Sequence, residues 1–96
     1  MQKLPNETIA QIHRIWDRAV GKVISAERRG LKISQEELGK YMGWRNRSTV
    51  SRIERGVRPV AIREIPILAR LLNMSVTQMT DEIYRQATAR PREVKK

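Results

Sequence analysis

The stretch from Ser34 to Glu54 reads SQEELGKYMGWRNRSTVSRIE and carries the signals for two short helices separated by a tight turn. Ser34 and Glu37 form a capping box, in which each side chain satisfies a free backbone amide at the start of a helix. Gly43 is the residue type most often found just past a helix C-terminus. The stretch predicts a helix-turn-helix with motif helices at about residues 34–42 and 47–55.

An apolar stripe at helical spacing precedes this stretch. Pro5 and Asn6 offer a helix start, and the stripe runs from there toward Gly30, either as one long helix or as two joined near Gly21. Its members are Ile9, Ile12, Trp16, Val20, Val23 and Ile24. Trp16 is expected to pack this N-terminal helix.

The sequence after the motif predicts two more helices. Pro66 falls in the first turn of one, where its missing amide does least harm, and that helix should stop near Asn73. Ser75 and Gln78 form a second capping box and open the other. We therefore predict an all-α fold, a small five- or six-helix bundle with an N-terminal helical extension.

Length and composition limit the chemistry of this 96-residue chain, which is long enough for one domain. The absence of cysteine excludes disulfides, thiolate metal sites and thiol catalysis. His13 is the only histidine, and the neighbouring Glu36 and Glu37 point to different sides of their helix, so they cannot chelate one ion. We expect no metal, no cofactor and no catalytic residue. No apolar run is long enough to cross a membrane, and we expect a cytoplasmic, nucleoid-associated protein.

The charge points to a nucleic-acid partner. The chain has a formal net charge of +10, and fourteen of its twenty basic residues are arginine, whose guanidinium fork matches phosphates and guanine edges. Residues 45–63 hold six arginines and one glutamate, so half of the net charge lies in a fifth of the chain, in and around the second motif helix. A second basic run at 90–96 contains Pro91 and predicts a flexible tail.

Three ordered motifs resemble the phage-repressor and Cro-like regulators, often called the XRE family. GLKISQEELG at 30–39 resembles the family's GLSQEELA signature, STVSRIERG at 48–56 its recognition helix, and ILARLLNMS at 67–75 its LAKALGVS segment. The resemblance covers residues 20–80, about two-thirds of the chain. It implies a phage repressor-like DNA-binding domain, placed here at 19–89 after an extension at 1–18.

The resemblance also assigns roles to single residues. Glu54 is expected to form a structural ion pair with Arg28 rather than to do chemistry. The base-reading residues would be Arg45, Arg47, Ser48, Thr49 and Arg52, and the phosphate-binding residues Gln35, Ser51, Arg55, Arg58 and Arg63. Leu38, Val50 and Ile53 are core residues by their spacing, and Trp44 is expected in the core rather than stacked on a base.

The turn departs from the family's pattern. The interval from Gly43 to Glu54 is one residue longer than in the family, and this leaves open which side chain leads the recognition helix. Asn46 is then a candidate N-cap of that helix, which would bring Arg45 closer to the DNA.

These motifs and the basic charge predict a transcriptional regulator that binds double-stranded DNA sequence-specifically. We expect a repressor that acts as a homodimer on a palindromic operator. The alternative is an antitoxin-type or other protein-interaction module that binds a toxin or another protein, with DNA binding as autoregulation. No small-molecule substrate is expected. Candidate dimer or partner interface residues are Ile9, Ile12, Met79, Ile83 and Tyr84.

Overall fold

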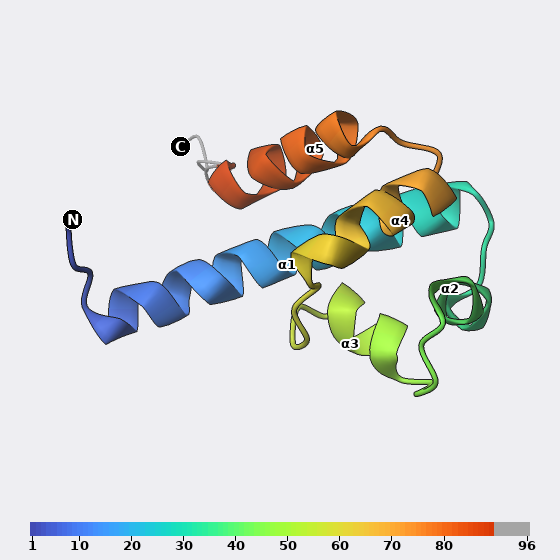
Figure 1. Ribbon diagram of the computed structural model, residues 1–96, viewed down its shortest axis with the longest axis horizontal. Helices are drawn as coiled ribbons and strands as arrows, with labels where there is room; N and C mark the ends of the chain where they lie inside the picture. The colour runs from blue at the N-terminus through green and yellow to red at the C-terminus, as the bar shows by residue number, and fades with distance from the viewer. Residues whose placement is uncertain (90–96) are drawn as a thin grey trace, which may run out of the picture.

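The computed structural model describes residues 1–89, and within them the chain is all-α, as predicted (Figure 1). The predicted flexible tail at 90–96 lies outside the described residues. The elements are α1 (Asn6–Gly30), α2 (Gln35–Met42), α3 (Thr49–Glu54), the 3-10 turn η1 (Ile62–Glu64), α4 (Ile65–Leu71) and α5 (Val76–Thr88).

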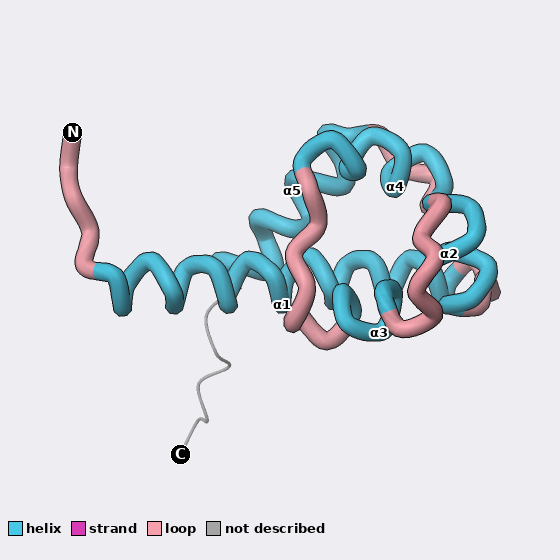
Figure 2. The backbone as a smooth tube through the Cα atoms, turned by 60° about the horizontal axis from the view of Figure 1, so that its bottom comes forward, coloured by secondary structure: helices cyan, strands magenta, loops and turns pink. Residues whose placement is uncertain are grey.

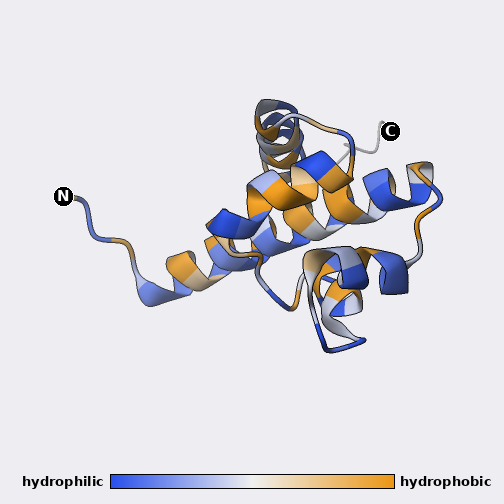
Figure 3. Ribbon diagram, turned by 45° about the vertical axis from the view of Figure 1, so that its right-hand side comes forward, coloured by the Kyte–Doolittle hydropathy of each residue, from blue (hydrophilic) through white to orange (hydrophobic). Residues whose placement is uncertain are grey.

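The N-terminal stripe forms one continuous helix of 25 residues, α1, and not two helices joined near Gly21. Its first turns project away from the other helices and carry apolar residues (Figures 2 and 3). The predicted boundary between an extension at 1–18 and a domain at 19–89 falls inside α1, which continues through it without a break.

The core lies where α1 meets α3 on one side and α5 on the other (Figure 1). Leu38, Val50 and Ile53 are buried there, as their spacing predicts, and Trp16 and Trp44 pack against this core half-buried. The buried apolar residues are Ala19, Val23, Ile24, Leu38, Val50, Ile53, Leu68, Ala69, Leu72, Met79 and Ile83.

The helix ends follow the local signals in the sequence. The Ser34 side chain accepts from the Glu37 N–H, and the Glu37 carboxylate accepts from the Ser34 N–H, each at 3.0 Å. Ser75 and Gln78 repeat this arrangement at the start of α5. Gly43 ends α2 with a φ of 74°, in the left-handed region that glycine adopts without strain. Both predicted capping boxes are therefore confirmed.

Candidate nucleic-acid interface

The turn between α2 and α3 is organised by Asn46. Its side-chain oxygen accepts from the Ser48 N–H at 2.9 Å and from the Ser48 hydroxyl at 2.7 Å, and its carbonyl accepts from the Thr49 N–H at 3.2 Å. Helix α3 begins at Thr49, two residues later than predicted, and its N-cap is Ser48 rather than Asn46. The prediction was wrong because Asn46 uses its side chain to close a tight turn before the helix.

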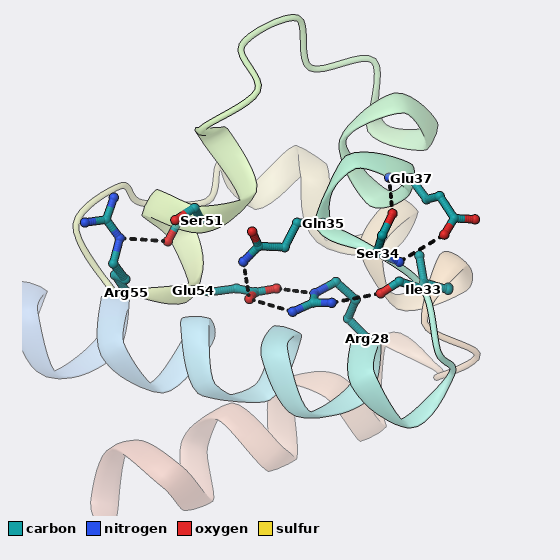
Figure 4. Close-up of polar contacts among 8 residues, drawn as sticks. All are labelled: Arg28, Ile33, Ser34, Gln35, Glu37, Ser51, Glu54 and Arg55. Atoms are coloured by element: carbon teal, nitrogen blue, oxygen red, sulfur yellow. Dashed lines mark hydrogen bonds and ion pairs between the residues drawn. The ribbon is translucent and has the colours of Figure 1, made fainter.

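A polar cluster joins α1, α2 and α3 (Figure 4). Arg28 Nε donates to Glu54 Oε2 at 2.6 Å and Arg28 Nη2 to Glu54 Oε1 at 3.0 Å, which is the pairing that the family resemblance implied. Gln35 Nε2 donates to the same Oε1 at 2.9 Å, and Arg28 Nη1 donates to the Ile33 carbonyl at 2.8 Å. The end of α3 is thus tied to the other two helices.

The cluster shifts the pKa values of both charged groups, Arg28 and Glu54. The Arg28 and Glu54 side chains are only 11% and 7% exposed. Burial of the Glu54 carboxyl disfavours its charged form, but the hydrogen bonds from Arg28 and Gln35 and the charge of Arg28 outweigh this and lower the pKa of Glu54. The hydrogen bond to Glu54 raises the pKa of Arg28. Both groups are therefore charged at neutral pH.

Gln35 sits where the family resemblance predicts a phosphate contact, at the first residue of α2. Its side-chain amide donates to Glu54 and so turns toward the protein interior (Figure 4). A phosphate contact by Gln35 would use its backbone N–H at the helix N-terminus, and it stays a prediction.

Gly21 sets how closely α1 and α3 approach, a role that sequence reasoning missed. A Cβ at this position would lie 2.3 Å from the Ile53 carbonyl oxygen and 2.7 Å from the Glu54 carbonyl oxygen. Only glycine permits this contact between two backbones. The available signal is a glycine on the inward side of a long helical pattern, which by itself indicates only a possible joint between two helices.

The predicted base-reading residues divide into two groups. Arg45, Arg47 and Arg52 are exposed at the turn and on α3, and Ser48 is half-buried. Thr49 is only 8% exposed because it lies on the face of α3 that carries Val50 and Ile53 into the core. This leaves Thr49 little surface for a contact with DNA, and its base-reading role stays a prediction.

The predicted phosphate-binding residues also differ among themselves. Arg63 and Arg55 are exposed, and Arg55 Nε donates to the Ser51 carbonyl at 3.3 Å. Ser51 is half-buried. Arg58 is held inside its loop, where its guanidinium lies 5.3 Å from the centroid of the Trp44 ring, donates to a carbonyl at 3.1 Å and is 3.8 Å from Glu64. These contacts give Arg58 a structural role, and its predicted phosphate contact stays a prediction.

Trp44 packs against the core rather than projecting outward, in line with its prediction. Its indole Nε1 donates to Glu64 Oε2 at 2.8 Å, and its ring packs against the buried cluster. Burial raises the pKa of Glu64, but hydrogen bonds from the Ala61 N–H and the Trp44 indole and nearby arginine charges outweigh this, so the net shift lowers its pKa. The hydrogen bond from Trp44 anchors the longer turn to the last residue of η1.

Two candidate interface residues are buried within the chain itself. Met79 is fully buried and Ile83 is 5% exposed, because both pack on α1 in the core. Their prediction as a dimer or partner interface is therefore wrong. Ile9 and Ile12 are each 38% exposed, and Tyr84 is exposed beside Trp16, with 6.0 Å between ring centroids.

Residues 1–89 contain neither a metal site nor a membrane-spanning helix. No group of three or more His, Cys, Asp or Glu side chains lies close enough together to hold a metal ion. None of the helices in this part of the chain combines the length and hydrophobicity needed to cross a bilayer.

The comparisons with known proteins agree with this geometry. Residues 24–79 match the helix-turn-helix family model. Among the curated proteins, none matches the chain. Among solved structures the chain is similar to the clp gene regulator ClgR from Corynebacterium glutamicum, with a TM-score of 0.68 and 19% identity, covering 75% of this chain and 76% of that one. That likeness shows a shared fold. Since the family model spans more than half of the chain, the chain belongs to the phage-repressor and Cro-like helix-turn-helix family of DNA-binding transcriptional regulators, which are not enzymes.

Proposed function

We propose that this protein is a repressor that binds a palindromic operator as a homodimer and reads each half-site with α3 in the major groove. The observation that carries the proposal is the outward position of Arg45, Arg47 and Arg52 at the N-terminal end and outer face of α3. The B-DNA major groove admits an α-helix, and an arginine fork pairs with the two acceptors on a guanine edge.

The contacts that fix α3 against α1 and α2 are consistent with a helix that reads bases in the major groove. The Arg28–Glu54–Gln35 cluster and the close approach at Gly21 hold α3 against α1 and α2 without using the exposed arginines. Base reading needs a rigid frame, because a misplaced fork loses its bidentate geometry. Arg55 and Arg63 remain exposed for phosphate contacts, which set affinity and salt dependence rather than sequence choice.

Homodimerisation is inferred from the size of the reading surface. A single recognition helix reads about 4 to 6 base pairs, and related modules gain specificity by pairing two half-sites about one helical turn apart. Ile9, Ile12 and Tyr84 are the exposed candidates that remain for an interface between copies.

The experiment that tests this function is a selection from a random 30-base-pair duplex library, followed by titration of the selected site and a scrambled duplex from low to physiological salt. The proposal expects a two-fold symmetric consensus, bound about a thousandfold or more tightly than the scramble. Equal binding of both duplexes, with both affinities collapsing as salt rises, would contradict it.

We expect Arg47→Ala and Arg52→Ala each to weaken binding to the selected site by about 1–3 kcal/mol and to relax the preference at one position of each half-site. The control is Arg85→Ala, because Arg85 is exposed on α5, across α1 from α3 (Figure 1). Repeating the library selection with each variant reads out the preference. A uniform loss at all positions would reassign the residue to phosphate contact.

A protein-interaction module is the second candidate. It is favoured by Ile9, Ile12 and Ile15, which are exposed on the projecting turns of α1, where a protein partner would cover them. The same titration separates the candidates. A module whose main partner is a protein, such as an antitoxin, still binds DNA as autoregulation but needs its partner present for full preference between the two duplexes.

A further inference from the structure

Glu36 differs from the other carboxylates in residues 34–64 of the motif region. The other three all accept short hydrogen bonds: Glu37 from the Ser34 N–H, Glu54 from Arg28 and Gln35, and Glu64 from Trp44 and the Ala61 N–H. Within the described residues Glu36 accepts no hydrogen bond. Its contribution to the fold is therefore small, since exposed ion pairs stabilise proteins by about 0–1 kcal/mol.

Glu36 lies beside the arginine that we expect to read DNA. Its Oε2 is 3.9 Å from Arg47 Nη2 and its Oε1 is 3.6 Å from Lys40 Nζ, with the Glu36 side chain 61% exposed and that of Arg47 90% exposed. Glu36, Lys40, Arg45 and Arg47 line the same surface hollow between α2 and the turn. A negative charge thus lies within the basic surface that the proposed function places against DNA.

We propose that Glu36 is a specificity-determining residue that makes Arg47 select a guanine edge over a phosphate. A phosphate that binds Arg47 brings its negative charge close to the Glu36 carboxylate, and the repulsion weakens the contact. A guanine edge offers two neutral acceptors, so Arg47 binds it while the carboxylate remains beside the guanidinium. Glu36 therefore weakens non-specific binding, in which Arg47 contacts a phosphate, and leaves binding to the operator nearly unchanged.

This inference rests on the proposed function, because it requires that Arg47 reads a base. The test compares the full chain with Glu36→Gln and with Glu7→Gln, a matched control on the exposed first turn of α1 that changes the net charge equally. Fluorescence anisotropy measures the affinities for the selected site and a scrambled duplex at several salt concentrations.

The expected result is that Glu36→Gln binds the scrambled duplex about three- to tenfold more tightly, from removal of one exposed like charge. Affinity for the selected site should change less than about twofold, so the ratio of the two affinities falls. The salt slope for the scrambled duplex should steepen by up to about 0.9, as for one more neutralised phosphate. Glu7→Gln should leave the ratio unchanged.

A second background tests whether Glu36 acts through Arg47. In Arg47→Ala, adding Glu36→Gln should no longer lower the ratio. An equal gain on both duplexes, an unchanged ratio, or the same fall in the Arg47→Ala background would each overturn the inference while leaving the proposed function intact. If the unmodified chain itself does not distinguish the two duplexes, the proposed function fails and the inference fails with it. Equal denaturation midpoints for Glu36→Gln and the unmodified chain show that folding does not cause the change.

Discussion

Gly21→Ala is expected to destabilise the protein by about 3 kcal/mol or more, because the new methyl group overpacks a contact that cannot relax. The atoms it would meet are the backbone carbonyl oxygens of Ile53 and Glu54, at 2.3 and 2.7 Å, and no side-chain rotation can remove them. Helix α3 would have to move off α1, and the exposed arginines would move with it. Urea unfolding followed by circular dichroism measures the loss, and binding to the selected site should fall as well.

Gly30→Ala is the matched control on the same helix. A Cβ at Gly30 would meet nothing within 4 Å. Alanine there should raise stability by about 0.5–1 kcal/mol, because it reduces the freedom of the unfolded chain and favours the helix. If both variants unfold at the same urea concentration, α1 and α3 do not approach in solution as closely as described.

Glu54→Ala is expected to lower the free energy of unfolding by about 2–4 kcal/mol, because it leaves the nearly buried Arg28 guanidinium without its negatively charged partner. It also removes the acceptor of the Gln35 amide. The comparison is Glu82→Ala, which breaks another Glu–Arg pair, at 3.2 Å to Arg85. The Arg85 side chain is 75% exposed, so this pair should contribute less than about 1 kcal/mol. Equal losses in chemical denaturation would show that burial adds nothing to the Arg28–Glu54 pair.

The Glu54 carboxylate also makes the stability of the protein depend on pH. Because the pKa of Glu54 is lowered in the folded state, the unfolded chain takes up the proton first as pH falls. The stabilisation is fully present above the unfolded value of about 4.3 and is lost as the pH drops through the lower folded value. We expect the free energy of unfolding of Glu54→Gln to fall less steeply between pH 7 and pH 3 than that of the unmodified chain. An equally steep fall in the variant would mean that other carboxylates cause the loss of stability in acid.

Features that join residues close in the chain were predicted well. The capping boxes at Ser34 and Ser75 and the left-handed glycine at Gly43 depend on residues three or four positions apart, so their signals are contained in short stretches. The apolar spacing likewise placed Leu38 in the core. Helix type and helix ends therefore follow from local hydrogen bonding and periodicity.

Features that depend on contacts between distant segments were predicted less well. The spacing of an apolar residue in an amphipathic helix predicts that it is buried, but it does not distinguish burial against its own chain from burial against a partner. The interface prediction for Met79 and Ile83 fails for this reason, since both are buried within the chain. Thr49 shows the same limit on α3, because the start of that helix depends on how Asn46 closes the turn. A shift of two residues in the helix start changes which side chain faces outward.

The sequence by itself determined the class of the protein: an all-α chain with two motif helices, a concentration of arginine around the second, and motifs that resemble one DNA-binding family. Only the tertiary structure decided which of those arginines are exposed and which make contacts within the chain. It also decided which groups Gly21, Gln35 and Glu36 approach. The physical reason is separation along the chain. Caps and helical periodicity act within one turn, whereas the Glu54 contacts span 19 and 26 residues and exist only once the helices have packed.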